Sequence, residues 1–451
     1  MGSEKIFSNP KISTALPGPK TNELLQRKMF SFLKTDLPRL QGFVANRAFG
    51  PWVEDVDGNV FLNFNSSINA VGECHPKVVA AIRDQITRLI SGSGRPFIEY
   101  AEKLKEVLPS EFKEGKIGYT ATGSEAIDLM TRLAREYSKK RVIISFHGVN
   151  FGEGTSDCSR LAGNAGQMYK GGIIPLISEV AYAPWPYCYR CPLGHSRKDC
   201  DLYCLSYFNE IFESISPDNV AAIITEGLPA NSGVMVPPFE YMQGLRSLCT
   251  KHGIMLLIDE IFSGFGKTGK MLAIENYNII PDIVAVGKSM GGGLPISAVA
   301  SKADIIDKCG SIARGTVGSF SGNVVSCVAA MATIEVIKEE KLFENASKLG
   351  VYLKHRLEEL ALRYDIIGDV RGIGLMIGVE LVKDRKTKIP ATDEAKNIQE
   401  YAYRKGLLLG RAGRYNYNNV LRMTPYLGTT QEQADLALDI LEGSLKSIKN
   451  S

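Results

Sequence analysis

The chain has 451 residues, of which 44% are hydrophobic and 23% charged, and its formal net charge of +4 is small for that length. This composition predicts an ordinary globular protein of about two or three domains and excludes a strongly basic nucleic-acid-binding protein, and no apolar stretch is long enough to span a membrane. Because the N-terminus lacks the apolar core of a signal peptide and the nine cysteines are an odd number spread along the chain, we expect a reduced, cytoplasmic protein.

The first elements are an arm and a small β unit, predicted for residues 1–75. The stretch "KIGYTATGSEAIDLMTRLAREYSKK" at residues 116–140 predicts a strand, a polar turn and then a helix. Ser124 is the candidate N-cap of that helix, because a serine hydroxyl can accept a hydrogen bond from first-turn amides. The apolar face of the helix is expected to consist of Ile127, Met130, Leu133 and Ala134.

Strands and helices continue to alternate along the chain. Apolar, β-branched runs predict strands at residues 141–148, 220–227, 254–260 and 283–286, and a helix is predicted at residues 239–253. Such alternation predicts an α/β fold with a mainly parallel sheet, covered by helices, that binds ligands at the carboxyl ends of its strands. From about Ala329 the pattern changes to long amphipathic helices with a few short strands, which predicts a smaller C-terminal domain. The expected parts are residues 1–75, 76–328 and 329–451.

Polar and aromatic residues gather at the predicted strand ends and at the start of the first helix in this series. They are Gly123, Ser124, Phe146, His147, Glu226, Asp259 and Lys288. A helix N-terminus with a glycine and a hydroxyl suits a phosphate group, and an aromatic ring can cover a flat cofactor. An aspartate and a lysine on successive strands can serve the two ends of one cofactor. Pyridoxal phosphate needs this set of a lysine, an acid and a phosphate cup.

Two other motifs suggest nucleotide binding but are incomplete. The stretch "GFGKTG" would be a P-loop only with glycine at position 261, which is Ile261. The stretch "RGIGLMIG" has Ile377 where the dinucleotide fingerprint requires its third glycine. Each candidate residue also has an ordinary alternative role, such as a core ring for Phe146 or a structural ion pair for Arg422. The hypothesis therefore depends on the ordered set rather than on any single residue.

Taken together, these motifs resemble those of the class III aminotransferases, which are pyridoxal-phosphate enzymes of fold type I. The resemblance runs from about residue 22 to the C-terminus and includes "PWVEDVDGNVFLNF", "TGSEA", "FHG", "IDEIFSGFGKTG", "VGKSMGGGLPISAV", "GSFSGN", "DVRGIGLMIGVEL" and "VLRMTPYL". The last third is most similar to the branch with 4-aminobutyrate aminotransferase-like enzymes and amino-acid racemases. This resemblance implies a homodimer or dimer of dimers with shared active sites, and neither nucleic acid nor membrane as a partner.

The resemblance implies a role for each residue around the cofactor. Lys288 would form the internal aldimine with pyridoxal 5'-phosphate and then move the substrate's proton. Asp259 would keep the pyridine nitrogen protonated. Gly123 and Ser124 would bind the phosphate, and Ser319 would reach the phosphate of the neighbouring subunit. The implied reaction moves an amino group from an amino acid or ω-amino compound to a 2-oxo acid through pyridoxamine phosphate.

The remaining implied roles concern the ring face and the substrate. Phe146 would stack on the cofactor ring, with His147 in the same cofactor-binding set. Arg422 would bind the substrate carboxylate, and Glu226 would pair with Arg422 and act as its gate. Ile68 would belong to the substrate-binding side of the site.

Three positions depart from the family pattern. Val149 stands where 4-aminobutyrate enzymes usually have an arginine for the distal carboxylate, so Arg411 or Arg414 would have to replace it. Phe262 replaces a glutamine that contacts the cofactor's phenolic oxygen, although it stays in the expected cofactor-binding set. Asn231 replaces the aspartate that is thought to serve the second face of the substrate in related racemases, and an amide cannot exchange a proton at neutral pH.

Asn231 therefore favours an aminotransferase over the alternative, a racemase or epimerase of the same family. A racemase needs an acid or base on each face of the substrate, whereas one lysine is enough for transamination. A third interpretation is a protein that retains the fold for binding or regulation. The presence of both Lys288 and Asp259 argues against it.

A separate stretch, "CYRCPLGHSRKDCDLYC" at residues 188–204, is rich in cysteine. Its thiols have the number and nearly the spacing of a structural zinc site, with His195 as a substitute ligand. They are Cys188, Cys191, Cys200 and Cys204. The alternative is a surface insertion with free thiols. The sequence favours free thiols and no metal, because three residues separate the second pair and the fold needs no metal.

Overall fold

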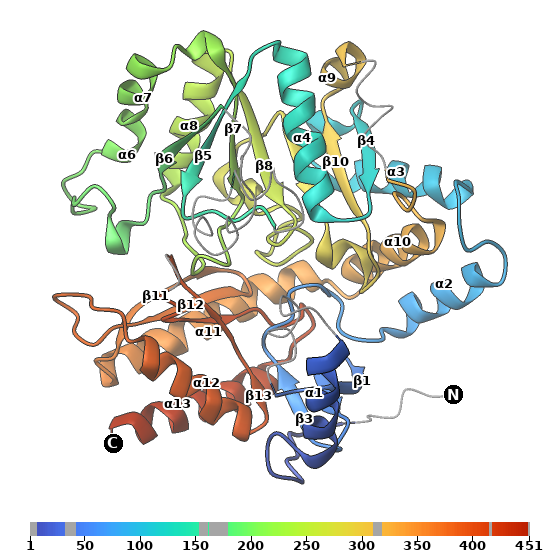
Figure 1. Cartoon of the computed structure of the whole chain (residues 1–451), viewed down its shortest axis with the longest axis vertical. Coiled ribbons are helices and arrows are strands. Elements are labelled where there is room, and N and C mark those ends of the chain that lie inside the picture. The colour runs from blue at the N-terminus through green and yellow to red at the C-terminus, as the bar shows by residue number, and fades with distance from the viewer. Residues whose placement is uncertain are drawn as a thin grey trace.

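The computed structural model describes residues 7–31, 42–152, 161, 179–309, 318–414 and 417–449. It has a large lobe built on a seven-stranded sheet and a second lobe that contains two four-stranded sheets (Figure 1). This is the α/β arrangement that the alternation of strands and helices predicted. Among the described residues, no helix is both long and apolar enough to cross a lipid bilayer.

The predicted strands of the large lobe are all present. The helices are α1 (Pro19–Ser31), α2 (Pro76–Ile86), α3 (Arg95–Val107), α4 (Gly123–Ser138), α6 (Tyr203–Ser206), α7 (Phe208–Ser214), α8 (Phe239–Lys251), α9 (Ala303–Lys308), α10 (Val324–Glu339), α11 (Leu342–Arg363), α12 (Thr392–Arg404) and α13 (Gln431–Lys449). The strands are β1 (Ala45–Phe49), β2 (Trp52–Asp55), β3 (Val60–Asn63), β4 (Lys116–Thr120), β5 (Val142–His147), β6 (Val180–Pro184), β7 (Val220–Glu226), β8 (Met255–Glu260), β9 (Ile283–Val286), β10 (Ser297–Ser301), β11 (Ile367–Ile373), β12 (Met376–Leu381), β13 (Leu407–Leu408), β14 (Gly410–Ala412) and β15 (Val420–Met423). Strands β4, β5, β7, β8 and β9 and helices α4 and α8 confirm the elements predicted from the sequence.

The seven-stranded sheet is mainly parallel and has the order β4-β10-β9-β8-β7-β5-β6. Strands β6, β5, β7, β8 and β9 run in one direction, and β10 is antiparallel to both of its neighbours. The central strands β7, β8 and β9 are buried along their whole length, which explains why their sequences are continuously apolar. Since their carboxyl ends share one edge of the sheet, the residues that end these strands lie together.

Helix α4 begins two residues earlier than the sequence suggested, because its N-cap is Thr122 and not Ser124. The Thr122 hydroxyl accepts a hydrogen bond from the Glu125 amide at 3.3 Å, and the Glu125 carboxylate accepts from the Thr122 amide at 2.9 Å. This reciprocal capping box outcompetes a lone serine cap. Ser124 is therefore the second residue of the helix. The predicted apolar face of α4 is confirmed as buried.

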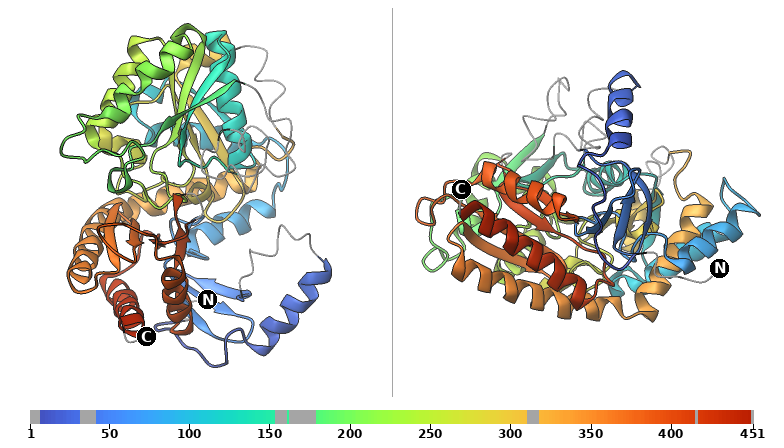
Figure 2. Two further views of the ribbon diagram at one scale, coloured as in Figure 1. Left: turned by 60° about the vertical axis from the view of Figure 1, so that its left-hand side comes forward. Right: turned by 90° about the horizontal axis from the view of Figure 1, so that it is seen from below.

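The second lobe joins the two ends of the chain. Strand β13 pairs in parallel with β3, so the sheet β1-β2-β3-β13 combines an N-terminal and a C-terminal segment. The other sheet, β11-β12-β15-β14, is antiparallel. Helix α10 packs against α2 and α3, and α11, which follows it, packs against β11. The left view of Figure 2 shows the lobes one above the other with the orange helices α10 and α11 between them. The expected boundary at residue 328 lies within α10.

Candidate active site

The carboxyl edge of the large sheet brings two acids and a lysine together. Glu226 ends β7 and lies opposite Asp259 on β8, and Asp259 in turn lies opposite Ala285 on β9. Lys288 follows the end of β9 by two residues. The positive charge of Lys288 acts on the carboxyl groups of both acids. Three residues that the sequence placed at separate strand ends are thus neighbours.

Burial sets the protonation of the two acids. It raises the pKa of Asp259 to about 6, against the opposing effects of the Ile261 amide, which donates to Asp259 at 2.8 Å, and of Lys288. Burial and the adjacent Asp259 raise the pKa of Glu226 to about 8, although the Asn150 amide donates to it at 2.8 Å. At neutral pH the pair therefore carries close to one negative charge, mainly on Asp259.

Lys288 has an unusual backbone for a lysine, with φ at +45° in the left-handed region. The residue before it is glycine, and a Cβ at Gly287 would lie 2.5 Å from Ser297 Oγ, so a larger residue would displace that side chain. Lys288 Nζ lies 4.4 Å from the centre of the Phe262 ring, and the Arg422 guanidinium carbon lies 5.1 Å from the same centre. Phe262 therefore contacts both cations of the site through its ring, where a glutamine would offer a hydrogen bond.

Arg422 is held by two amide oxygens. Its Nη1 donates to Asn231 Oδ1 at 2.6 Å and its Nη2 donates to Asn65 Oδ1 at 3.0 Å. Desolvation lowers the pKa of Arg422 to about 10, and the charge of Glu226 opposes that shift. The expected direct ion pair with Glu226 is not among the described contacts, because Glu226 is held by the Asn150 amide and its burial favours the neutral acid.

The start of helix α4 shares a wall with the Lys288 loop. A Cβ at Gly123 would lie 3.0 Å from Ile261 Cδ1, and one at Gly287 would lie 3.3 Å from Ile261 Cγ2. Ser124 Oγ lies close to Gly152 on the loop after β5, since a Cβ there would be 2.6 Å away. The first-turn amides of α4 thus face the same edge of the sheet as Lys288.

Phe146, expected to stack on a cofactor ring, packs within the aromatic core of the large lobe. Its side chain is fully buried, with its ring centre 5.3 Å from that of Trp185 and 6.1 Å from that of Phe208. Side chains alternate along a strand, so the next residue, His147, is on the opposite face, exposed and stacked on Tyr182 at 5.1 Å. Phe146 is therefore part of the aromatic core, and His147 presents its ring on the exposed face of β5.

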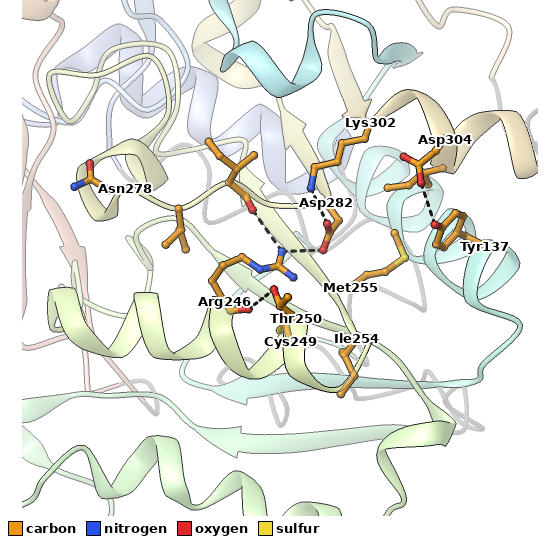
Figure 3. A pocket seen from close by; sticks show the side chains of 14 residues that line it. Tyr137, Arg246, Cys249, Thr250, Ile254, Met255, Asn278, Asp282, Lys302 and Asp304 are labelled. Atoms are coloured by element: carbon orange, nitrogen blue, oxygen red, sulfur yellow. Dashed lines mark hydrogen bonds and ion pairs between the residues drawn. The ribbon is translucent and has the colours of Figure 1, made fainter.

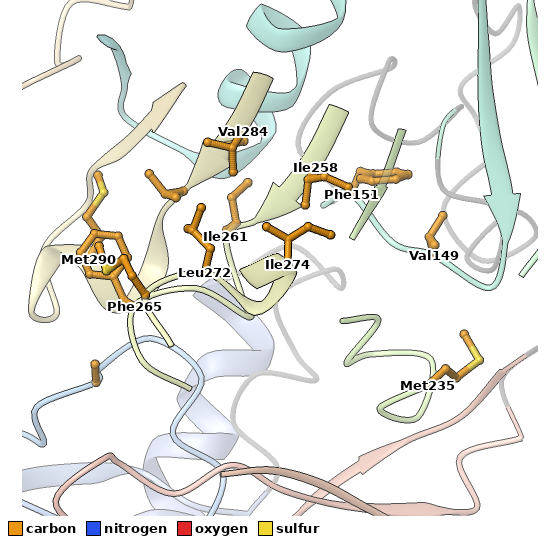
Figure 4. Close-up of a cluster of buried hydrophobic side chains, with 14 of the residues drawn as sticks. Val149, Phe151, Met235, Ile258, Ile261, Phe265, Leu272, Ile274, Val284 and Met290 are labelled. Carbon is orange, nitrogen blue, oxygen red and sulfur yellow. The ribbon is translucent and has the colours of Figure 1, made fainter. Parts of the chain in front are cut away.

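The other expected residues lie around this edge. Val149 is fully buried among the hydrophobic side chains of Figure 4. Ile68 is 52% exposed and follows Asn65, which binds Arg422. Ser319 is exposed in the turn before α10, and its neighbour Gly318 lies near Glu125 at the start of α4. The structure thus places Ile68 and Ser319 where a substrate or a second chain can reach them.

The two arginines proposed as replacements for a residue at position 149 differ in location. Arg411 Nε donates to Gln399 Oε1 at 2.7 Å, beside a cavity of about 700 Å³ in the second lobe. Arg414 is buried next to the loop after β5, since a Cβ at Gly148 would lie 3.6 Å from Arg414 Nε. Arg414 is therefore beside the loop that carries Val149, whereas Arg411 lines a cavity together with Asn65.

Another cavity, of about 670 Å³, lies away from this edge (Figure 3). It is lined by Met255, the first residue of β8, and by Asp282, which precedes β9, so it is at the amino ends of these strands. Asp282 accepts from Arg246 at 2.8 Å and from Lys302 at 2.9 Å. These ion pairs stabilise the edge of the sheet at the amino ends of its strands. The cavity is therefore not part of the candidate active site, which lies at the carboxyl ends.

Sequence reasoning missed the buried Lys267, which belongs to the stretch first tested as a P-loop. Its Nζ donates to the carbonyl oxygens of Ser66 at 2.8 Å and Pro425 at 3.1 Å. Burial, with a smaller effect of Arg422, lowers the pKa of Lys267 to about 7. It ties the large lobe to both segments of the second lobe beside Arg422. Asn65 was also missed, because an asparagine after a short strand usually signals only a turn.

Comparisons with known proteins bear on the family. The model of a family described as "Aminotransferase class-III" matches residues 36–445. The chain is 38% identical over 438 residues to a leucine/methionine racemase of Thermococcus litoralis, with 95% of this chain and 96% of that protein covered. It is 34% identical to a 5-aminovalerate aminotransferase of Pseudomonas aeruginosa, with 94% of this chain and 98% of that protein covered. A solved amine transaminase from an uncultivated Pseudomonas species, in the PLP-bound form, matches with a TM-score of 0.84 and 26% identity over 99% of this chain and 100% of that chain.

Proposed function

The chain belongs to the class-III aminotransferases, which depend on pyridoxal phosphate, and from that premise we propose how its own residues perform amino transfer. In this proposal an amino acid or ω-amino compound gives its amino group to a 2-oxo acid at the carboxyl edge of the large sheet. One observation carries the proposal: Lys288, Asp259 and Glu226 lie on adjacent strand ends. The start of α4 borders the same edge.

The chemistry of these residues fits pyridoxal phosphate. Lys288 supplies an amine, and the first-turn amides of Gly123 and Ser124 suit a phosphate. Asp259 is a buried carboxylate with a raised pKa, which a cationic ring nitrogen would lower again. Ser289 Oγ, beside Lys288, is buried and has no hydrogen-bond partner among the described residues. When bound, the cofactor supplies an electron sink for the charge left behind when the substrate loses its α-proton.

Lys288 Nζ is the group proposed to take and return that proton. A lysine can do so only if its amine is neutral for part of the cycle, and two ionised carboxylates beside it would keep it protonated. Burial keeps Glu226 mostly protonated at neutral pH, so Asp259 supplies the main negative charge near the amine. If Asp259 paired with a cationic ring nitrogen, its negative charge would be neutralised and would no longer favour the protonated amine of Lys288.

Arg422 is proposed to bind the carboxylate of the substrate. The neutral oxygens of Asn231 and Asn65 orient its guanidinium and leave its charge uncompensated, ready for a bidentate pair. Val149 is buried and offers no second cationic anchor. We therefore expect neutral α-amino acids, held at Arg422 through the α-carboxylate, to be better donors than 4-aminobutyrate.

Racemisation is the second candidate, because the relative with 38% identity is a leucine/methionine racemase. The argument against it is Asn231, whose side-chain oxygen accepts a hydrogen bond from Arg422. An amide in that place orients the arginine but exchanges no proton at neutral pH. Transfer needs only the proton carrier Lys288 and is therefore the favoured activity.

We also propose a homodimer in which Ser319 reaches the phosphate site of the partner chain. The exposed turn with Ser319 lies beside the loop between α2 and α3, since Asn323 Nδ2 donates to the Ile90 carbonyl at 2.9 Å. Large apolar side chains of this area are exposed in the single chain: Ile86, Leu89, Ile90, Ile98 and Phe320. Such a surface is suited to burial against a second copy. Sedimentation at assay concentration tests this, and a fully active monomer would contradict it.

A donor screen tests the proposed activity. Single enantiomers of alanine and leucine, together with 5-aminovalerate, glutamate and 4-aminobutyrate, are offered with pyruvate or 2-oxoglutarate. Keto-acid formation and optical purity are measured in the same samples. We expect one keto acid for each amino group transferred, with the neutral α-amino acids as the fastest donors. Loss of optical purity without keto acid would show a racemase instead.

A further inference from the structure

The cysteine-rich segment, residues 186–204, gathers its thiols around one small cavity. This cavity of about 20 Å³ is also lined by His195 and Arg197. Its four cysteines are Cys188, Cys191, Cys200 and Cys204, all of which are free thiols. A space of this size holds about one water molecule or one ion. The four thiols are thus brought together within 17 residues, from the 3-10 turn that contains Cys188 to helix α6, which contains Cys204.

The hydrogen bonds described for these thiols are weak and go to backbone carbonyl oxygens. Cys188 Sγ lies 3.9 Å from the Pro186 carbonyl oxygen and Cys200 Sγ lies 3.8 Å from that of Arg197, which are weak hydrogen bonds. Cys204 is buried, and Cys188, Cys191 and Cys200 are partly buried around the same cavity. Because the described sulfur contacts are weak, an ion that enters the cavity would displace little.

We propose that these four cysteines bind one structural zinc ion. The three-residue spacing of the second pair counted against a metal in the sequence, but cysteine pairs separated by two to four residues do occur in structural zinc sites. Four thiolates would complete a tetrahedral shell with Zn–S distances of ~2.3 Å. A zinc ion would bind these cysteines as thiolates. Arg197, which lines the same cavity, would offset part of the negative charge of such a centre. This site is independent of the proposed amino transfer.

The site is not preformed. Within the described ranges, no three His, Cys, Asp or Glu side chains stand at ligating positions. Binding therefore requires the thiols to rotate into the cavity. For Cys188, Cys191 and Cys200, which lie in a single 3-10 turn or outside helices and strands, the described sulfur contacts that rotation would break are weak. Cys204 is buried in α6, so the other three thiols would have to move toward it. His195 remains beside Tyr203, with ring centres 4.8 Å apart.

The turn at residues 187–191, which contains the first two cysteines, connects the large lobe to the second lobe. Tyr187 and Arg190 both donate hydrogen bonds to the buried Glu380 on β12. Arg371 Nη1 donates to the same carboxylate at 2.8 Å, and its Nε donates to the Gly233 carbonyl at 2.9 Å. Gly233 is two residues from Asn231, which orients Arg422. A zinc ion that fixes the turn would therefore hold a lobe contact adjacent to the candidate active site.

Metal analysis of the full-length protein tests the proposal. The protein is produced with added zinc, purified without chelators and analysed by mass spectrometry of its metals. We expect about one zinc per chain. The double variant Cys188→Ser/Cys200→Ser, which removes one thiol from each pair, should retain less than about one tenth of that zinc. The control Cys249→Ser alters a buried cysteine of α8 outside the cavity and should retain all of it.

A second measurement covers the case in which the double variant does not fold. Wild-type protein is pulsed with iodoacetamide with and without a strong chelator, and each modified cysteine is identified. The four cavity thiols should react at least about tenfold more slowly before chelation than after it, whereas the exposed Cys74 should react equally in both. Less than about one tenth of a zinc per chain, zinc retained by the double variant, iron in place of zinc, or chelator-insensitive thiols would each overturn the proposal.

Discussion

Replacing Asp259 by asparagine keeps the shape of the side chain and removes its charge. Burial raises the pKa of Asp259 from 3.8 to about 6, which means that the folded protein pays to ionise this carboxylate. At 1.36 kcal/mol per pKa unit, the shift of about two units corresponds to about 3 kcal/mol. A cationic ring nitrogen beside the carboxylate would recover that free energy. The substitution Asp259→Asn is therefore expected to weaken cofactor binding by about 10²-fold, since each 1.4 kcal/mol is tenfold.

The assay is a titration of cofactor-free protein, followed by cofactor absorbance and by the initial rate of keto-acid formation. Glu260→Gln is the matched control, because Glu260 is buried at the end of the same strand but accepts from Ser263 and, at 2.8 Å, from the Ile274 amide. The control should bind cofactor within about twofold of wild type. Unchanged cofactor affinity and rate in Asp259→Asn would refute the assignment of Asp259 to the ring nitrogen.

Three further substitutions test the residues around Arg422. Arg422→Lys keeps the charge but loses the fork that two amides orient, so kcat/KM for α-amino acids should fall by about 10–100-fold, and an unchanged value would show that the carboxylate binds elsewhere. Asn65→Asp places a carboxylate where an amide oxygen now lies 3.0 Å from Arg422 Nη2, so KM should rise much more than in Asn65→Ala; equal effects in kinetic assays would contradict this. The pKa of Glu226 is raised from 4.5 to about 8, so its stabilising contribution is complete below pH 4.5 and is lost as pH rises through 8. Denaturant unfolding should therefore show Glu226→Gln gaining on wild type between these pH values, and a constant difference would disprove the raised pKa.

The strands and the central residues of the site could be predicted because their signals are local. Buried parallel strands must be continuously apolar, and the residues after them must then share one edge of the sheet. Lys288 and Asp259 follow directly from that rule. The signal for the cap of α4 was local too, but it was missed. Ser124 is a good N-cap residue by itself, whereas the true cap is the pair Thr122 and Glu125, which form a capping box.

Contacts between distant segments could not be predicted. Phe146 is the last residue but one of β5, and its ring packs against Trp185 and Phe208, which come from elements remote in sequence. Arg422 is held by Asn231 and Asn65 rather than by Glu226, a choice that depends on where three separate segments meet and on how burial protonates the acid. Pairings of this kind depend on tertiary geometry, and no periodicity or spacing encodes them.

The central claim is that Lys288 is the lysine that binds the cofactor, and the site of attachment can be measured directly. The structure offers a specific rival to Lys288, because burial lowers the pKa of Lys267 to about 7 and so favours a neutral, nucleophilic amine. Lys267, however, is enclosed and donates to two carbonyl oxygens, whereas Lys288 lies at the strand edge beside Asp259. Borohydride reduction of the cofactor-loaded protein, followed by proteolysis and peptide mass analysis, locates the attachment. We expect the cofactor mass on the peptide that contains Lys288, and its appearance on Lys267 or on no lysine would contradict the assignment of Lys288.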